Sequence, residues 1–306
     1  MKHNTQYFSD FMARYNYSEE SVKVFTEILA KLDEDEKFGA EFDKLVNRYM
    51  SIFCGDSRKY YERAAKLGEP YGFHEYSMHF VFLLCCVPLL EKKYEKKGID
   101  KQIFWDTMDD LRCKLNECID CKGIPGTFVV GWFRGFFEMT RFTYGRFQFE
   151  KGCFGDKHSY TLSCGKVLKP GGKYVNIHIP SSGVPLTDEV RFDSYRRAWE
   201  AFKFMFDDDI VIFGCGSWLL FQPPKAYLPP HLNTVKFMND FEIVSQHEGK
   251  LEDNAWRIFG KYGWGPAEQL PRDTTLRKAF AEYYCDGNPA GSAFGVFAFD
   301  GEKILK

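Results

Sequence analysis

The residues best suited to binding an anion stand in one loop between two predicted elements. Ser181, Ser182 and Gly183 follow a strand-like run at residues 174–179, and a helix is predicted to start at Thr187. The first amides of a helix lack partners within the helix, and the helix dipole favours negative charge at that end. Small side chains leave such amides accessible. This loop is a candidate phosphate-binding loop, although the same strand–loop–helix joint is common in proteins that bind no phosphate.

Two other groupings suggest metal chemistry but do not meet its requirements. Cys118 and Cys121 have the C-x-x-C spacing of a zinc knuckle or redox centre, yet no second pair stands at knuckle distance and the motif closes a predicted helix. His74 and His79 are five residues apart, whereas the zinc-protease helix needs a spacing of four so that both face one metal. We therefore expect no metal site.

The elements around the loop predict a β-α-β unit. The predicted helix at residues 187–206 carries an aromatic stripe at steps of three and four, formed by Phe192, Tyr195, Trp199, Phe202 and Phe206. Thr187 can cap the helix, and the acidic residues after it suit the positive end of the dipole. A second strand is expected at residues 210–213, most simply parallel to the first, with a right-handed crossover.

Composition limits the class of protein. The 306 residues carry a formal net charge of −2, so nothing suggests a general affinity for nucleic acid. The longest apolar run, residues 79–90, is too short to span a bilayer, and the start lacks the apolar core of a signal peptide. We expect a cytoplasmic protein that binds no membrane and whose ten cysteines are reduced.

The chain changes character near residue 122, which predicts an all-helical domain at residues 1–122 and a mixed domain at residues 123–306, an α+β protein overall. Six helices are expected in the first domain, with Pro88 kinking or shortening the fifth, at residues 4–15, 18–32, 37–53, 58–67, 73–93 and 101–118. Besides the β-α-β unit, a helix is expected at residues 274–284. Strands are expected at residues 128–130, 140–150, 162–168, 233–237, 241–245 and 295–299, with a strand or a short helical turn at 254–259.

The second half resembles a family of bacterial acyltransferase-like proteins. The resemblance rests on a set of short runs, which are Asn176-Ile177-His178-Ile179-Pro180, Cys215, Ser217-Trp218-Leu219-Leu220, Tyr227-Leu228-Pro229, Asn233-Thr234-Val235 and Gly145-Arg146-Phe147-Gln148-Phe149-Glu150. Family members pair a helical N-terminal domain with a C-terminal domain similar to the GNAT superfamily of N-acetyltransferases. The resemblance implies a mixed, mostly antiparallel sheet with flanking helices.

It also implies acyl-CoA as cosubstrate. In GNAT-type folds the pantetheine arm lies along the fourth strand, which splays from the fifth, and the pyrophosphate sits on the following loop. On this chain the implied cofactor-binding residues are Val175, Ile177, Ile179, Ser181, Ser182, Gly183 and Val184. The loop departs from the usual Arg/Gln-x-x-Gly-x-Gly/Ala pattern, since Pro180 and Pro185 lack amide donors and the helix opens with two acidic residues.

The resemblance implies transfer of the acyl group to an amine of a small molecule or peptide. Tyr227 is the candidate acid, and His178 or Glu150 the candidate base. Cys215 is a candidate thiol in the cleft, and it would also permit a hydrolytic reaction. Ser217 and Trp218 are candidates to line the substrate site.

Each of these residues also has a purely structural reading, as a packing, hydrogen-bonding or surface residue. The alternative function is therefore a catalytically inactive binding or regulatory protein of the same fold. The oligomeric state is left open.

Overall fold

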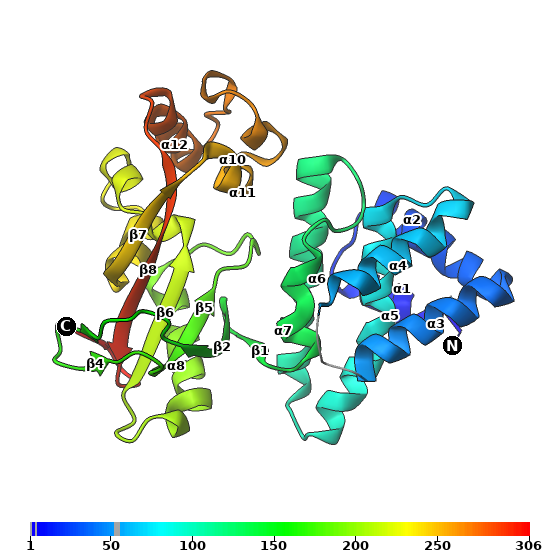
Figure 1. Cartoon of the computed structure of the whole chain (residues 1–306), viewed down its shortest axis with the longest axis horizontal. Helices are drawn as coiled ribbons and strands as arrows, with labels where there is room; N and C mark the ends of the chain where they lie inside the picture. The colour runs from blue at the N-terminus through cyan, green and yellow to red at the C-terminus, as the bar shows by residue number, and fades with distance from the viewer. Residues whose placement is uncertain (1, 4, 52–55) are drawn as a thin grey trace. The chain divides into compact units, whose positions relative to one another are not determined.

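The chain forms two compact units, Met1–Thr140 and Arg141–Lys306 (Figure 1). The computed structural model describes residues 2–3, 5–51 and 56–306. The division expected after residue 122 coincides with the end of a helix, whereas the structural division falls at Thr140. Whether residues 1–122 fold as a domain on their own stays a prediction.

The first unit is helical. Its described elements are α1 (Gln6–Arg14), α2 (Glu19–Glu34), α3 (Glu36–Ser51), α4 (Arg58–Gly68), η1 (Glu69–Tyr71), α5 (Glu75–Lys96), α6 (Lys101–Lys122), η2 (Val130–Phe133) and α7 (Arg134–Phe137). The α5 helix is buried on nearly all sides because α2, α3, α4 and α6 pack around it. For example, Phe80 of α5 stacks on Phe25 of α2 with ring centroids 4.7 Å apart. An apolar helix of this kind forms the centre of a bundle.

The second unit is built on one mixed sheet with the order β1-β2-β5-β6-β8-β7, and β9 pairs with β8. The strands are β1 (Arg141–Tyr144), β2 (Phe147–Cys153), β5 (Lys173–His178), β6 (Val211–Ser217), β7 (Glu242–Gly249), β8 (Ala290–Phe299) and β9 (Ile304–Leu305). Only the β5–β6 pair is parallel, and every other ladder of the sheet is antiparallel. The protein is therefore α+β, as expected.

The two faces of the sheet carry different cores. On one face, which we call the helix face, α8 (Asp188–Phe202) and α9 (Asn233–Asp240) pack on side chains such as Phe147, Val175 and Phe213. On the opposite face, which we call the open face, a hairpin of β3 (Tyr160–Thr161) and β4 (Val167–Leu168) covers a smaller core. Further along the chain lie η3 (Lys203–Met205), η4 (Trp218–Leu220), η5 (Pro223–Tyr227), α10 (Leu251–Asn254), α11 (Trp256–Phe259), η6 (Gly260–Trp264), η7 (Ala267–Gln269) and α12 (Thr275–Cys285).

Several expected elements differ from the observed ones. Residues 233–237, expected as a strand, begin helix α9, whose buried residues Val235 and Met238 recur at helical spacing. Residues 128–130 were also expected as a strand, but residues 128–129 precede η2 and Val130 is its first residue. Residues 162–168 make no strand of the main sheet and instead form the turn and second strand of the β3–β4 hairpin.

Helix α5 continues through Pro88 to Lys96, because its buried packing outweighs the lost backbone hydrogen bond. The expected helix ends at Asn4 and Phe53 lie outside the described residues.

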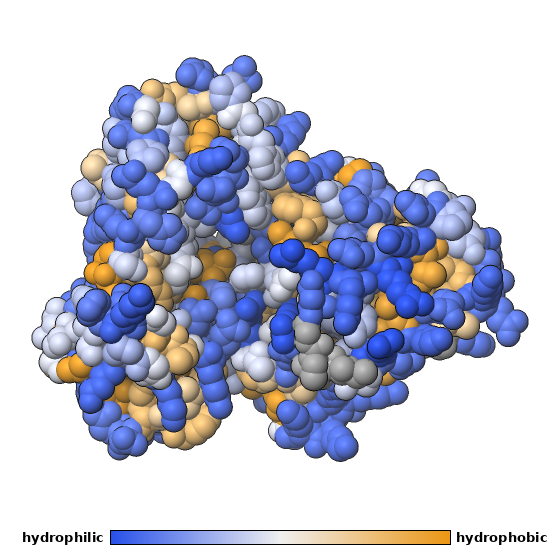
Figure 2. Space-filling model, in the orientation of Figure 1, coloured by the Kyte–Doolittle hydropathy of each residue, from blue (hydrophilic) through white to orange (hydrophobic). Residues whose placement is uncertain are grey.

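Hydrophilic residues cover most of the face shown in Figure 2, and hydrophobic residues appear there only in small patches. No single helix among the described residues is long and apolar enough to cross a membrane, although the bent pair Arg58–Tyr71 and Glu75–Lys96 passes that test of length and composition together.

Candidate functional site

Strands β5 and β6 separate after a very short ladder. Their parallel pairing joins only Val175 with Phe213 and Asn176 with Gly214. Past these pairs β5 continues to His178 and β6 to Ser217, each still paired on its other side, with β2 and β8 respectively. Backbone polar groups inside a sheet require partners. The diverging ends of β5 and β6, which we call the splay, therefore offer an extended ligand a place between two strands.

The loop after β5 presents free backbone donors. Among the described residues, no hydrogen bond uses the backbone N–H groups of Ser181, Ser182 or Gly183. Gly183 has a φ of +81°, a left-handed conformation that favours glycine. The Thr187 side chain caps α8 by accepting a hydrogen bond from the amide of Val190 at 3.3 Å. Three amides that donate no hydrogen bond among the described residues, next to a capped helix start, fit an anionic group such as a pyrophosphate.

Arg146, in the turn between β1 and β2, holds this loop. Its Nε atom donates to the carbonyl oxygen of Val184 at 2.8 Å, and its Nη1 atom donates to that of Pro180 at 2.9 Å. The guanidinium therefore ties both ends of the loop together and brings a positive charge beside it. No role was predicted for Arg146, whose only signal in the sequence is its place in a run that carries the family resemblance.

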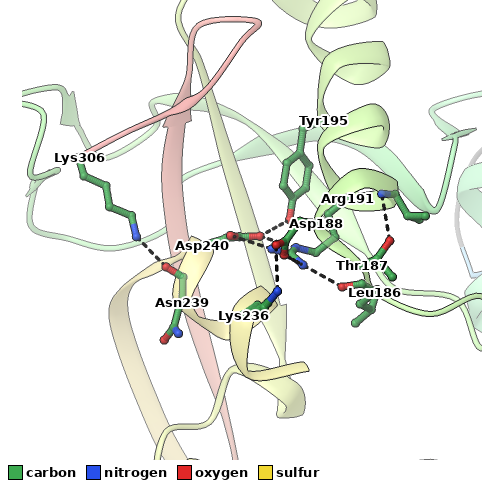
Figure 3. A network of polar contacts seen from close by, with 10 residues as sticks. Leu186, Thr187, Asp188, Arg191, Tyr195, Lys236, Asn239, Asp240 and Lys306 are labelled. Carbon is green, nitrogen blue, oxygen red and sulfur yellow. Dashed lines mark hydrogen bonds and ion pairs between the residues drawn. The ribbon is translucent and has the colours of Figure 1, made fainter. Parts of the chain in front are cut away.

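One of the two acidic side chains at the start of α8, Asp188, is paired with two cations. Asp188 accepts hydrogen bonds from Lys236 and from Arg191, both at 3.0 Å (Figure 3). The bond from Lys236, followed by those from Arg191, holds the pKa of Asp188 below its usual value. The repulsion of phosphate expected from this carboxylate is therefore offset by two cations.

A buried ion pair anchors α8 to α9. Arg191 is 2% exposed and donates through Nε and Nη2 to the two carboxylate oxygens of Asp240, at 2.8 and 3.3 Å. Its Nη1 atom donates to the carbonyl oxygen of Leu186 at 2.8 Å, just before the start of the helix (Figure 3). Burial alone would lower the pKa of Arg191, but the hydrogen bond to Asp240 raises it, so the guanidinium stays charged. The pair fixes the end of the loop on the helix face of the sheet.

His178 and Glu150, the two candidate bases, meet on neighbouring strands. The Nε2 atom of His178 lies 2.6 Å from Oε1 of Glu150, and the two side chains are 18% and 21% exposed. The pairing of β2 with β5 sets Glu150 opposite Asn176, whose amide donates to the same Oε1 atom at 3.3 Å. Arg141 of β1 donates to both oxygens of Glu150 at 3.1 Å. We call His178, Glu150, Asn176 and Arg141 the polar cluster.

The cluster keeps Glu150 ionised. Burial alone would raise the pKa of Glu150, but hydrogen bonds from His178 and Arg141 outweigh it and lower the pKa to about 2. An ionised carboxylate can only accept, which assigns the proton of this contact to Nε2 of His178, and Nδ2 of Asn176 lies 3.0 Å from the same nitrogen. In the neutral form of this tautomer the lone pair is on Nδ1. Sequence reasoning found His178 and Glu150 but not their contact, nor the supporting roles of Arg141 and Asn176.

Tyr227, the candidate acid, lies at the end of η5 against α12. Its hydroxyl donates to Oδ2 of Asp286 at 2.7 Å, and its ring meets that of Tyr283 edge to face. The hydrogen bond to Asp286 raises the pKa of Tyr227 above its usual value. The hydroxyl is thus held in one position and keeps its proton at neutral pH.

The remaining candidate residues pack locally. Cys215 is 1% exposed in the core of the helix face, where burial raises the pKa of its thiol to about 12, so the nucleophilic thiolate is disfavoured. Ser217 accepts a hydrogen bond from the amide of Leu219 at 3.1 Å, and Trp218 packs edge to face on Phe280.

The candidate cofactor-binding residues on β5 and directly after it also pack into the protein. Val175 and Ile177 bury their side chains in the core of the helix face, while Ile179 is partly buried against it. These residues can therefore offer a ligand between the strands their backbone, not their side chains.

Two family models match this chain. A model of the N-acyltransferase N-terminal domain matches residues 7–139, and a model of the GNAT-like C-terminal domain matches residues 142–297. The chain belongs to this N-acyltransferase family. No curated protein matches it.

Solved structures of acyltransferases share the fold of this chain. An acyltransferase mutant in complex with octanoyl-CoA is 17% identical, with a TM-score of 0.73 over 95% of this chain and 87% of that chain. An acyltransferase in complex with decanoyl-CoA is 18% identical, with a TM-score of 0.69 over 94% of this chain and 86% of that one. A third, in complex with decanoyl-CoA and teicoplanin, is 15% identical, with a TM-score of 0.62 over 98% and 99% of the two chains. At these identities the likeness establishes the fold.

Proposed function

We propose that this family member is an acyl-CoA-dependent N-acyltransferase. The observation that carries the proposal is the splay, where the β5–β6 ladder ends after two residue pairs directly before a loop with three free amides. An extended pantetheine arm can take the place of the missing part of the β5–β6 ladder. A pyrophosphate can accept hydrogen bonds from the amides of Ser181, Ser182 and Gly183. The acyl-CoA complexes of three structural neighbours support this choice of cosubstrate.

The proposed reaction is direct attack by an amine on the thioester carbonyl carbon. A carbon–nitrogen bond forms, the carbon–sulfur bond breaks, and the amine loses a proton while the thiolate gains one. His178 accepts the amine proton, and Glu150 lies 2.6 Å from its Nε2 atom. In this step Tyr227 turns its hydroxyl proton from Asp286 to the departing thiolate, donates it and recovers a proton from solvent. Glu150 orients the imidazole and stabilises the imidazolium that forms.

The acceptor is proposed to be an amine of a small molecule or peptide. One structural neighbour binds decanoyl-CoA together with teicoplanin, and another binds CoA with 10C-teicoplanin, which supports an acceptor larger than a simple metabolite.

Titration calorimetry tests the proposal directly. CoA and octanoyl-CoA are titrated into the full chain, with adenosine as a control ligand that lacks both pyrophosphate and pantetheine. We expect both CoA ligands to bind in the micromolar range or tighter, and adenosine to bind far more weakly. Absence of any CoA binding at millimolar ligand contradicts the proposal.

A binding or regulatory protein of the same fold is the second candidate. The prolines on either side of the loop, Pro180 and Pro185, lack amide donors and favour this version. It is distinguished by amine-dependent release of CoA from acyl-CoA, measured with a thiol reagent across a panel of amines and peptides. Binding of acyl-CoA without any amine-dependent release supports the regulatory version.

A further inference from the structure

Two glycines leave β6 bare on the open face of the sheet. Gly214 and Gly216 are two residues apart in the strand, so both face the same side, opposite Phe213 and Cys215 of the helix-face core. Gly214 also pairs with Asn176 at the point where the splay begins. Any group that leaves the splay toward the open face therefore meets backbone here and no side chain of β6.

The space over Gly214 is filled by two aromatic rings. A methyl group on Gly214 would stand 2.7 Å from Cδ2 of Tyr174 and 3.0 Å from Cζ of Phe294. The Tyr174 ring also occupies the position that a Cβ on Gly152 of β2 would take, so it lies across bare backbone on both neighbouring strands. The rings of Tyr174 and Phe294 meet at 66°, with centroids 5.4 Å apart. We call this pair the aromatic floor.

The space over Gly216 is different. A methyl group there would meet, within 4 Å in the described part of the chain, only Cδ2 of Phe294 at 3.9 Å. Two aromatic rings therefore cover the open face of β6 at Gly214, where the splay begins and which we call the splay apex. Two residues further along, at Gly216, this face of β6 is open. Phe154, Leu162, Leu168 and Val296 pack behind the floor in the smaller core and hold its rings in place.

We infer that the aromatic floor limits the length of the acyl chain that this protein accepts. The inference rests on the proposed function, because it places the thioester at the splay apex near Asn176 and Gly214. An acyl chain continuing from that point toward the open face runs against Tyr174 and Phe294. Gly216 leaves room for the first carbons, and the rings over Gly214 end that room. Chain length is then set by side-chain volume at two positions, one on β5 and one on β8.

The test measures dissociation constants by calorimetry for CoA and for straight-chain acyl-CoAs from acetyl to dodecanoyl. Tyr174→Ala and Phe294→Ala remove the rings, and each is expected to shift the tightest ligand to a longer chain. Each newly buried methylene can tighten binding up to about fourfold. Affinity for CoA itself should change little. Gly216→Ala adds one methyl group where space exists, so it should fold normally and weaken long chains relative to acetyl-CoA.

Two control variants isolate the effect. Tyr174→Phe keeps the ring and should keep the wild-type chain-length profile. Phe202→Leu removes aromatic volume from the core on the helix face and should also leave the profile unchanged. If Tyr174→Ala is poorly folded, Tyr174→Leu and Phe294→Leu open smaller spaces and carry the same expectation.

The outcomes separate the inference from the function beneath it. A wild-type protein that binds no CoA or acyl-CoA overturns both. A wild-type protein that binds acyl-CoAs, with Tyr174 and Phe294 variants that bind CoA normally but keep the wild-type chain-length profile, overturns the inference alone. A shift in the profile that is equally large in Phe202→Leu also overturns it.

Discussion

His178 and Glu150 form a hydrogen bond of 2.6 Å between residues 28 positions apart in the chain, across the β2–β5 ladder. The contact joins two separate candidates for the base into one unit, in which the ionised carboxylate accepts a hydrogen bond from Nε2–H of His178.

Removing the imidazole should abolish most of the proposed transfer rate. We expect His178→Ala to lower kcat by about 10²–10⁴-fold, the usual contribution of a positioned general base, with little change in KM for acyl-CoA. Glu150→Gln keeps the shape but loses the charge, so a smaller loss of roughly tenfold is expected. Steady-state kinetics with a saturating amine check both. Equal rates in wild type and His178→Ala would remove His178 from the mechanism.

The charge of Glu150 should also stabilise the fold in a pH-dependent way. Its pKa is about 2 in the folded chain, below its ordinary value of 4.5, so its contribution is complete above pH 4.5 and is lost as the pH falls from there toward 2. Urea unfolding should therefore show the stability difference between wild type and Glu150→Gln shrinking by about 2 kcal/mol from pH 7 to pH 3. A difference that stays constant contradicts the low pKa.

Arg146 should be required for CoA affinity without being required for folding. Arg146→Ala frees the carbonyl groups of Pro180 and Val184 and removes a cation from the loop, so CoA should bind about tenfold or more weakly at low salt. Arg146→Lys can reach one carbonyl but cannot reproduce the fork, so partial loss is expected. Affinity for CoA and dephospho-CoA should fall in parallel, since both carry the pyrophosphate. Unchanged affinity in Arg146→Ala would mean that the pyrophosphate binds elsewhere.

Tyr227 should affect the chemical step if its hydroxyl is the acid. Tyr227→Phe keeps the ring packing on Tyr283 and removes only the proton donor, so kcat should fall about tenfold or more while the affinity for acyl-CoA is kept. The loss should be smallest for thioesters with a low-pKa thiol, because a good leaving group needs less help from an acid. A uniform loss with every thioester points instead to a packing role.

Replacing only one member of the buried Arg191–Asp240 ion pair should lower the free energy of unfolding strongly. Either Arg191→Met or Asp240→Asn leaves a buried polar group poorly paired, and a loss of about 3–5 kcal/mol in the free energy of unfolding is expected for the arginine variant. The double variant should lose less than the sum of the single losses. Urea unfolding measures all three. Additive losses would show that the two side chains do not interact as the distances indicate.

Local sequence patterns predicted the unit of β5, α8 and β6 well. The aromatic stripe, the Thr187 cap and two apolar runs were enough to predict β5, α8 and β6, because each depends on neighbouring residues. Residues 233–237, the first part of helix α9, were predicted as a strand, because their Val and Phe residues favour strands locally and only packing on the helix face decides otherwise.

The candidate site was harder to predict than its elements. The contact of Glu150 with His178 depends on the register of β2 against β5, and the β3–β4 excursion lies between them. No local rule sets that register. Arg146 was missed for a related reason, since its role depends on a loop more than thirty residues away. The contact of Tyr227 with Asp286 likewise joins η5 to the end of α12, which no spacing in the sequence indicates.

Strand β8 is the last long strand to leave the ribosome, yet it lies between β6 and β7. Until it arrives, both of those earlier strands expose open edges that invite pairing with other chains. The half of the splay formed by β6 therefore gains its support from β8 only after β8 has been synthesised, and chains truncated before Ala290 should be prone to aggregation.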